Sequence, residues 1–228
     1  MTERPILFSG EMVRAILADQ KTQTRRVVNP QPPGECRIHY MLGHERWVTP
    51  VHGTPLRHTW EAWHGPLYQN RPAKYLCGVH TVRCPYGAPG DRLWVRETWR
   101  GVSCIHYRAD GAIVHGGRMG GEPTDPRVVS TWEPTPEDLE GFRWLPSIHM
   151  PRWASRITLE ITDVRVQRLK DISYDDVLAE GCPLPGPLAS PADFDWYRAL
   201  WDSLNKARGY GWNVNPWVWA ITFRRVGV

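Results

Sequence analysis

Alternation of apolar and polar residues, which begins at Ile157 and continues to Val166, constrains the fold of this chain more than any other feature. Ile157, Leu159 and Ile161 are separated by polar residues, and the apolar positions continue at Val164 and Val166. Because successive side chains of a strand lie on opposite faces, this pattern predicts a long strand with one face in a core.

A closing strand at residues 217–226 is predicted by a second alternation, which is rich in aromatic residues. One face carries Trp217, Trp219, Ile221 and Phe223, and the other carries Val218, Ala220, Thr222 and Arg224. Shorter strands are expected at 6–8 and 92–99, and helices at 9–18, 173–180 and 193–204. This mixed order lacks a βαβα rhythm and predicts an α+β fold, a small mixed β-barrel with helices at its openings.

The chain of 228 residues suits a single domain, 1–228, with two insertions at about 35–86 and 116–142. Neither insertion has a clean hydrophobic period. We expect a few short strands in the first and loops in the second.

Composition and charge exclude several classes of protein. Lys and Arg number 28 against 24 Asp and Glu, and the net charge of +4 is compatible with a nucleic acid, nucleotide or phosphate ligand without proving one. No apolar run approaches the roughly 18–20 residues of a membrane helix, and no hydrophobic signal segment is present. We therefore expect a protein of the reducing cytoplasm, away from membranes, and we expect it to be a monomer.

The five cysteines stand at irregular positions, which argues against a disulfide framework. Cys36, Cys77, His80 and Cys84 are candidate zinc ligands, but they lack the paired C-x₂-C spacing of zinc knuckles. The zinc-deaminase signature, the P-loop and the G-x-S-x-G elbow are absent from the sequence. We predict no metal and no cofactor, while leaving open whether these four residues bind one.

The basic segment at residues 21–26, with the sequence KTQTRR, is a candidate catalytic site. A threonine hydroxyl needs a base, and a lysine acts as one when burial or neighbouring cations lower its pKa. A spacing of three residues within a turn brings Lys21 and Thr24 together, with Arg25 and Arg26 as neighbouring cations. The alternative is a solvated basic turn before a strand that begins at Val27.

Two glutamates stand at unusual places in the predicted elements. Glu180 occupies the last turn of a helix, just before Gly181, where a negative charge opposes the helix dipole. Glu97 ends the apolar face of the strand at 92–99, which points to a pocket or a salt bridge. Both are candidate site residues, although Glu180 also fits an exposed surface position.

A loop bounded by prolines, just before the long strand, contains residues that could stack on a base and hydrogen-bond to it. Ser147, His149, Arg152 and Trp153 lie in this loop, and Trp99 ends an earlier strand. Aromatic rings and guanidinium planes stack on bases, while hydroxyl and imidazole groups hydrogen-bond to them. The alternative is that each Trp packs inward and each Arg faces solvent.

Several of these features together resemble the ASCH domain, a member of the PUA-like superfamily. Residues 18–26 look like the family's A-G-x-K-T-x-T-x-R stretch, with Asp19 in place of the glycine. The Gly-Asp pair at 90–91 resembles the family's strand-opening turn. The helix that ends at Glu180, followed by an aromatic strand, matches the family's order, and residues 144–156 are similar to a stretch of phage and prophage ASCH proteins.

The resemblance implies a PUA-like β-barrel with a few flanking helices and long loop insertions. Small bacterial ASCH enzymes are N4-acetylcytidine amidohydrolases that use a Lys, a Thr and a Glu, which correspond here to Lys21, Thr24 and Glu180. Thr24 would attack the acyl carbonyl, Lys21 would deprotonate it and hold the oxyanion, and Glu180 would pass a proton to the leaving amine.

The expected substrate is therefore a modified cytidine or a similar nucleoside or nucleotide, with Arg25 and Arg26 among the substrate-binding residues. Two alternatives stay open. One is a non-catalytic module that binds RNA or a modified base. The other is an RNA-cleaving ASCH protein, in which Lys21 and the Arg side chains stabilise a phosphorane.

Overall fold

The structure of the protein is a computed structural model that describes residues 1–31, 37–41, 44–48, 79–81, 84–101, 104–115, 143–183 and 190–226. Its strands are β1 (Glu3–Leu7), β2 (Gln23–Val27), β3 (Arg37–Met41), β4 (His44–Val48), β5 (Val79–Thr81), β6 (Arg92–Arg96), β7 (Trp99–Arg100), β8 (Cys104–Tyr107), β9 (Ile113–His115), β10 (Thr158–Arg168) and β11 (Trp217–Val226). Its α-helices are α1 (Gly10–Leu17), α5 (Tyr174–Ala179) and α6 (Pro191–Asn205).

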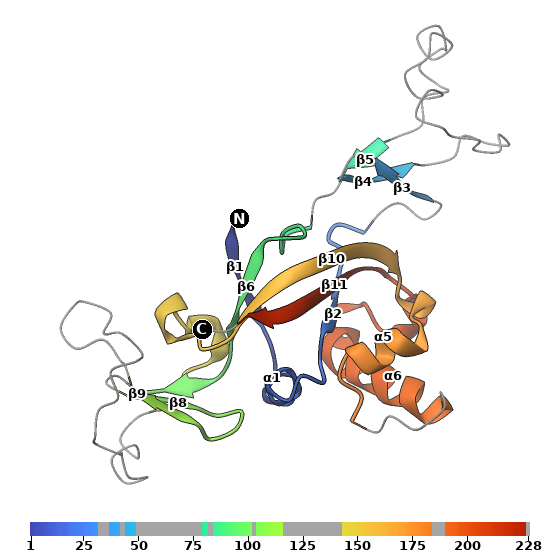
Figure 1. The fold of residues 1–228 in the computed structure, drawn as a ribbon. Helices are drawn as coiled ribbons and strands as arrows, with labels where there is room; N and C mark the ends of the chain where they lie inside the picture. Colours follow the sequence, from blue (N-terminus) through green and yellow to red (C-terminus); the bar gives the residue numbers. More distant parts are fainter. Residues whose placement is uncertain are drawn as a thin grey trace, which may run out of the picture.

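A five-stranded mixed sheet in the order β1-β6-β10-β11-β2 forms the centre of the fold (Figure 1). β1 and β6 are parallel, and the other neighbouring strands are antiparallel. The α+β class is thus confirmed. The expected closed barrel is not found in the described residues, because no hydrogen-bonded ladder joins the edge strands β1 and β2.

Two of the three α-helices of the described residues begin where the sequence signals predict them. Ser9 caps α1, and its hydroxyl accepts a hydrogen bond from the backbone N–H of Met12 at 3.4 Å. Ser173 and Asp176 form a capping box at the start of α5. The third helix, α6, begins at Pro191, two residues earlier than predicted, because proline is tolerated in the first helical turn.

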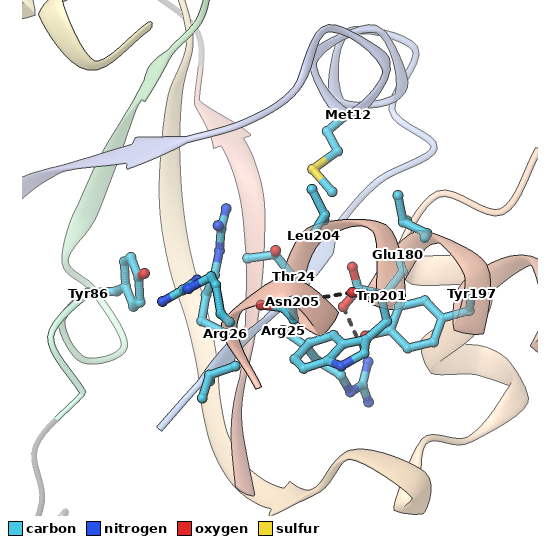
Figure 2. A pocket seen from close by; sticks show the side chains of 13 residues that line it. Met12, Thr24, Arg25, Arg26, Tyr86, Glu180, Tyr197, Trp201, Leu204 and Asn205 are labelled. Carbon is cyan, nitrogen blue, oxygen red and sulfur yellow. Dashed lines mark hydrogen bonds and ion pairs between the residues drawn. The ribbon is translucent and has the colours of Figure 1, made fainter. Parts of the chain in front are cut away.

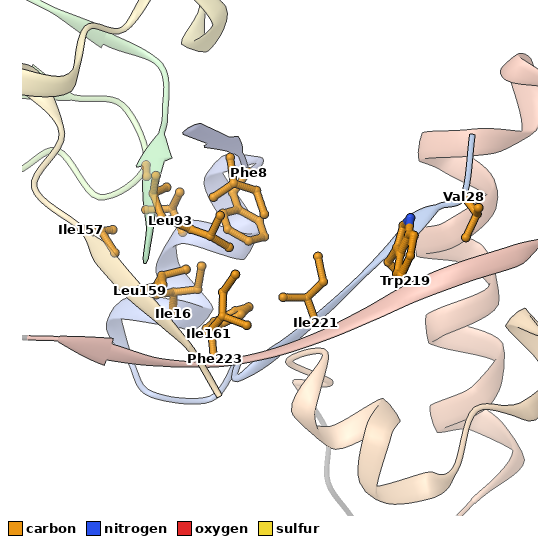
Figure 3. Packing of buried hydrophobic residues seen from close by; sticks show 14 of the residues in the cluster. Phe8, Ile16, Val28, Leu93, Ile157, Leu159, Ile161, Trp219, Ile221 and Phe223 are labelled. Carbon is orange, nitrogen blue, oxygen red and sulfur yellow. The ribbon is translucent and has the colours of Figure 1, made fainter. Parts of the chain in front are cut away.

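Of the three hydrophobic clusters in the described residues, two pack the helices against the central sheet. The first, which packs α1 against the sheet (Figure 3), includes Phe8, Val13, Ile16, Leu93, Leu159, Ile161, Ile221 and Phe223. The second, which packs α5 and α6 against the sheet, includes Leu169, Ile172, Val177, Tyr197, Trp201 and Val218. Val218 and Trp219 are adjacent in β11 yet belong to different clusters. Both faces of β11 are therefore covered, as its nearly continuous apolar sequence requires.

Part of the predicted insertion at 35–86 is described. β3, β4 and β5 form a small antiparallel sheet there, which confirms the expectation of a few short strands. The predicted loops at 116–142 lie outside the described residues. A third small sheet has the order β7-β8-β9. Within the described residues, no helix is long and apolar enough to cross a membrane.

The substitution Ile161→Ala should lower the free energy of unfolding by about 2–5 kcal/mol, because it leaves a cavity in the first cluster. Ile161 is 0% exposed, whereas Ile148 is 56% exposed. The control Ile148→Ala should change stability by less than about 0.5 kcal/mol. Urea unfolding followed by tryptophan fluorescence measures both, and equal effects would contradict the buried position of β10.

Candidate active site

The basic segment at residues 21–26 leads directly into a strand. After α1, Asp19 adopts a positive φ of 55°, and β2 then begins at Gln23, which pairs with Thr222 of β11. Asp is among the few residues that tolerate this left-handed conformation, so the turn forms without glycine. The predicted strand start at Val27 is wrong, because pairing with β11 begins four residues earlier.

Burial excludes the interpretation of this segment as a solvated basic turn. Lys21 is only 2% exposed, and Thr24 and Arg25 are also buried, while Arg26 is partly buried. A buried cation without a partner is costly, so each of these side chains needs a compensating group. The groups that pair with these buried side chains therefore determine whether the segment can form a catalytic site.

Lys21 and Glu180 form a buried ion pair. The Nζ atom of Lys21 donates to Glu180 Oε2 at 2.6 Å and to the Glu180 backbone carbonyl at 2.8 Å. Glu180 is 4% exposed, so its interpretation as a surface residue is wrong. Burial lowers the pKa of Lys21, Glu180 opposes this shift, and the nearby charges of Arg26 and Arg25 add to it.

Gly181 allows the close approach of Glu180 to Lys21. Its φ is +91°, and a Cβ atom at this position would lie 3.2 Å from the Cβ atoms of both Ala15 and Lys21. Glycine is therefore required by conformation and by space. Gly181 thus ends the helix, as the sequence predicts, and its backbone conformation also determines the geometry of the Lys21–Glu180 ion pair.

Arg25 is held by two carboxylates. One nitrogen, Nη2, lies 2.8 Å from Asp176 Oδ2, and the other, Nη1, lies 3.4 Å from Glu180 Oε1. Asp176 also accepts hydrogen bonds from Gln23 at 3.1 Å and from Arg165 at 2.9 Å. Burial alone would raise the pKa of Asp176, but the charge of Arg25 and the hydrogen bonds hold that pKa well below its usual range. Arg25 thus links α5 to β2 and fixes the Glu180 carboxylate.

A cavity of about 250 Å³ lies beside this network (Figure 2). It is lined by Met12, Thr24, Arg25, Arg26, Val27, Tyr86, Glu180, Tyr197, Leu200, Trp201, Leu204, Asn205 and Arg208. In Figure 2, Thr24 lies between Tyr86 on one side and Tyr197 on the other. Lys21 is not part of the lining, and it reaches the cavity through its contact with Glu180.

Sequence reasoning missed the lining residues that α6, the turn at Tyr86 and the short 3₁₀ helix after α6 contribute. Tyr197 and Trp201 lie on the apolar face that helical spacing predicts for α6, and this spacing was the available signal. Tyr86 and Arg208 gave no signal, because Tyr86 lies in a turn and Arg208 ends a short 3₁₀ helix, and both meet the other lining residues through tertiary packing alone.

Glu97 does not line this cavity. Its carboxylate accepts two hydrogen bonds from Arg156, at 2.9 and 3.0 Å, so the salt-bridge interpretation of Glu97 is confirmed. Burial raises the pKa of Glu97, and the hydrogen bonds and charge of Arg156 oppose the shift. Arg156 also pairs with the exposed Asp110 at 2.9 Å, so this network connects the loop before β10 to the turn after β8.

The predicted stacking loop forms a separate surface. Its candidate residues, none of which lines the cavity, are Ser147, His149, Arg152 and Trp153. Trp153 packs edge-on against Trp99, with 5.8 Å between ring centroids, and stays 41% exposed. Arg152 pairs with Glu3 of β1 at 2.9 Å. A role of these residues in substrate binding stays a prediction.

The described residues include no group of three or more His, Cys, Asp or Glu side chains that could hold a metal ion. The candidate ligands Cys36 and Cys77 lie outside the described residues, as does the side chain of His80. Of the four, Cys84 alone has a described side chain, and it packs against the first hydrophobic cluster.

Comparisons with known proteins give no match. The chain matches no family model, no curated protein and no solved structure among those searched.

The substitution Asp176→Asn should destabilise the protein by roughly 3–5 kcal/mol at neutral pH, because it removes a carboxylate that pairs with buried Arg25. The folded-state pKa of Asp176 lies below its unfolded value of about 3.9. Its contribution is therefore complete above about pH 5 and is lost as the pH falls through 3.9 towards the folded pKa. The stability difference from wild type should shrink accordingly in urea unfolding between pH 7 and pH 3.

Asp175→Asn is the matched control, because Asp175 is the exposed neighbour of Asp176 in the same helical turn. It should cost less than about 1 kcal/mol, the typical size of an interaction with the helix dipole. A stability difference for Asp176→Asn that is independent of pH would contradict the proposed pairing.

Proposed function

We propose that the protein is an amidohydrolase that removes an N4-acyl group from a modified cytosine nucleoside or nucleotide. The observation that carries this proposal is that Glu180 contacts Lys21 at 2.6 Å and lines the same cavity as Thr24. We also propose that the mixed sheet and its flanking helices belong to the PUA-like class of folds.

The Lys21–Glu180 pair is suited to hold and release one proton. Burial destabilises the ammonium form of Lys21, and the 2.6 Å hydrogen bond allows its proton to pass to Glu180. In the resulting neutral pair, the Lys21 amine is a base and the Glu180 carboxyl is an acid. The two functions that amide cleavage needs then stand side by side.

The first half of the reaction forms an acyl-enzyme. The Thr24 Oγ1 atom attacks the carbonyl carbon of the N4-acyl group, and the Lys21 amine accepts the hydroxyl proton. Breakage of the carbon–N4 bond follows, and the Glu180 carboxyl gives its proton to the leaving amine. The acyl group is now an ester of Thr24, and the pair consists of a Lys21 ammonium and a Glu180 carboxylate.

The second half of the reaction restores the enzyme. Water attacks the ester carbonyl and gives a proton to the Glu180 carboxylate. The bond to Thr24 Oγ1 breaks, and this oxygen regains its proton from the Lys21 ammonium. Arg25, which lies 3.4 Å from Glu180 Oε1, positions the carboxylate during both steps.

A non-catalytic module that binds RNA or a modified base is the second candidate. The observation in its favour is that the Lys21 ammonium is fully enclosed, with its hydrogen bonds directed to the side chain and carbonyl of Glu180. A purely structural ion pair has the same arrangement. Such a module would bind its base in the cavity without turnover.

Purified protein should release cytidine and acetate from N4-acetylcytidine, as measured by chromatography. Thr24→Val removes the nucleophile while keeping the side-chain shape, Lys21→Met removes the base, and Glu180→Gln removes the acid. Each substitution should lower kcat by about 10²–10⁴-fold, the usual contribution of a positioned acid or base.

The matched control is Thr22→Val, because Thr22 has the same hydroxyl two residues away and is exposed. This variant should retain the wild-type rate. Urea unfolding shows whether each variant is folded before its rate is compared. Binding of cytidines by wild-type protein without release of any N4-acyl group would favour the non-catalytic module.

A further inference from the structure

Positive charge at the cavity is compensated unevenly. Lys21 and Arg25, at the inner end of the network, are paired with carboxylates at 2.6 and 2.8 Å. Arg26 and Arg208 line the cavity itself, as Arg25 does. In the part of the chain that the structure describes, neither of these two guanidinium groups forms an ion pair with a carboxylate.

Arg26 is held in place by groups that leave its charge uncompensated. It donates a hydrogen bond from Nη2 to the Leu7 backbone carbonyl at 2.6 Å, and its guanidinium lies 5.2 Å from the ring centre of Phe8 and 6.0 Å from that of Tyr86. Its Nε atom is buried without a hydrogen-bond partner among the described residues. Burial lowers the pKa of Arg26, while Tyr86, Glu180 and Tyr197 oppose this shift and the like charge of Arg208 adds to it. This site therefore carries a preorganised positive charge that an anion would stabilise.

We infer that Arg26 and Arg208 form a phosphate subsite, so that the substrate is a cytidine mononucleotide and not a neutral nucleoside. This inference rests on the proposed function and defines its substrate class. Arg26 lies beside Tyr86, on the side of Thr24 that faces away from Tyr197 and Trp201 (Figure 2). The phosphate binds on the Arg26 side, and the modified base lies towards Glu180, with its acyl group next to Thr24.

Phosphate is the anion that fits these two side chains best. A phosphomonoester carries about −1.5 to −2 charges at pH 7, which matches two guanidinium groups. Arginine binds phosphate oxygens through two parallel N–H groups, and such charge-assisted hydrogen bonds are stronger than neutral ones. The cavity of about 250 Å³ lies just below the range of about 300–1,000 Å³ that is typical of ligand sites, so a single nucleotide suits it better than a polynucleotide chain.

Calorimetric titration of the full chain with cytidine, cytidine monophosphate and inorganic phosphate tests the inference without requiring turnover. Cytidine monophosphate should bind about 10- to 100-fold more tightly than cytidine, the range expected for hydrogen bonds to a charged group. Inorganic phosphate should compete with the nucleotide for the site. Higher salt should reduce the difference in affinity between cytidine monophosphate and cytidine. A short oligocytidine should bind no more tightly than the mononucleotide.

Arg208→Gln should abolish most of the preference for the nucleotide over cytidine. Arg208 is exposed, so this variant is expected to fold even if Arg26→Gln does not. Arg198→Gln, at an exposed position of α6, is the matched control and should keep the full preference. Equal affinity of wild-type protein for cytidine and its monophosphate, or an unchanged preference in Arg208→Gln, would overturn the inference.

The failures of the two proposals are distinguishable. Hydrolysis of N4-acetylcytidine without preference for the phosphorylated form would refute the phosphate subsite and leave the amidohydrolase in place. Tight binding of the monophosphate without hydrolysis of its N4-acetyl derivative would refute the amidohydrolase and support the subsite. If the oligocytidine bound more tightly than the mononucleotide, the bound phosphate would belong to a polynucleotide, and the inference that the substrate is a mononucleotide would be refuted.

Discussion

The buried ion pair between Lys21 and Glu180 is the interaction on which the candidate site depends. Removing two charges from water is costly, and their attraction offsets this cost only when geometry and additional hydrogen bonds are favourable. Here the ammonium also donates to the Glu180 carbonyl, and Arg25 approaches the opposite carboxylate oxygen. The pair therefore connects the segment just before β2 to the end of α5. Gly181, which has no Cβ atom, allows Lys21 and Glu180 to approach each other closely.

The central sheet positions the strand that follows Lys21, and with it this ion pair. β10 and β11 pair along nearly their whole length, and β11 is covered on both faces by separate hydrophobic clusters. β2 takes its position from β11, so Thr24, Arg25 and Arg26 are placed opposite Ile221, Ala220 and Trp219. Alternation along β2 then sends Arg25 towards Asp176 and Glu180, while Arg26 contacts Leu7 and Phe8. Two adjacent arginines thus acquire different environments, and we assign them different functions.

Much of the fold follows from local patterns. Alternation predicts β10 and β11, and the capping residues Ser9 and Ser173 predict the starts of α1 and α5, because these signals depend on neighbours within a few residues. The same reasoning fails for the start of β2, since a polar segment becomes a strand here by pairing with β11. It also fails for the barrel, because closure depends on pairing between strands that are distant in the sequence.

By itself, the sequence determined the α+β class, the main strands and helices, and the identity of Lys21, Thr24 and Glu180 as candidates. The tertiary structure alone decided that Lys21 and Glu180 are buried against each other, and that Tyr86 and Arg208 join them at one cavity. It also decided that Glu97 and the loop at 147–153 lie outside that cavity. The physical reason is that burial and pairing are properties of contacts between distant segments, whereas periodicity and capping record contacts between near neighbours.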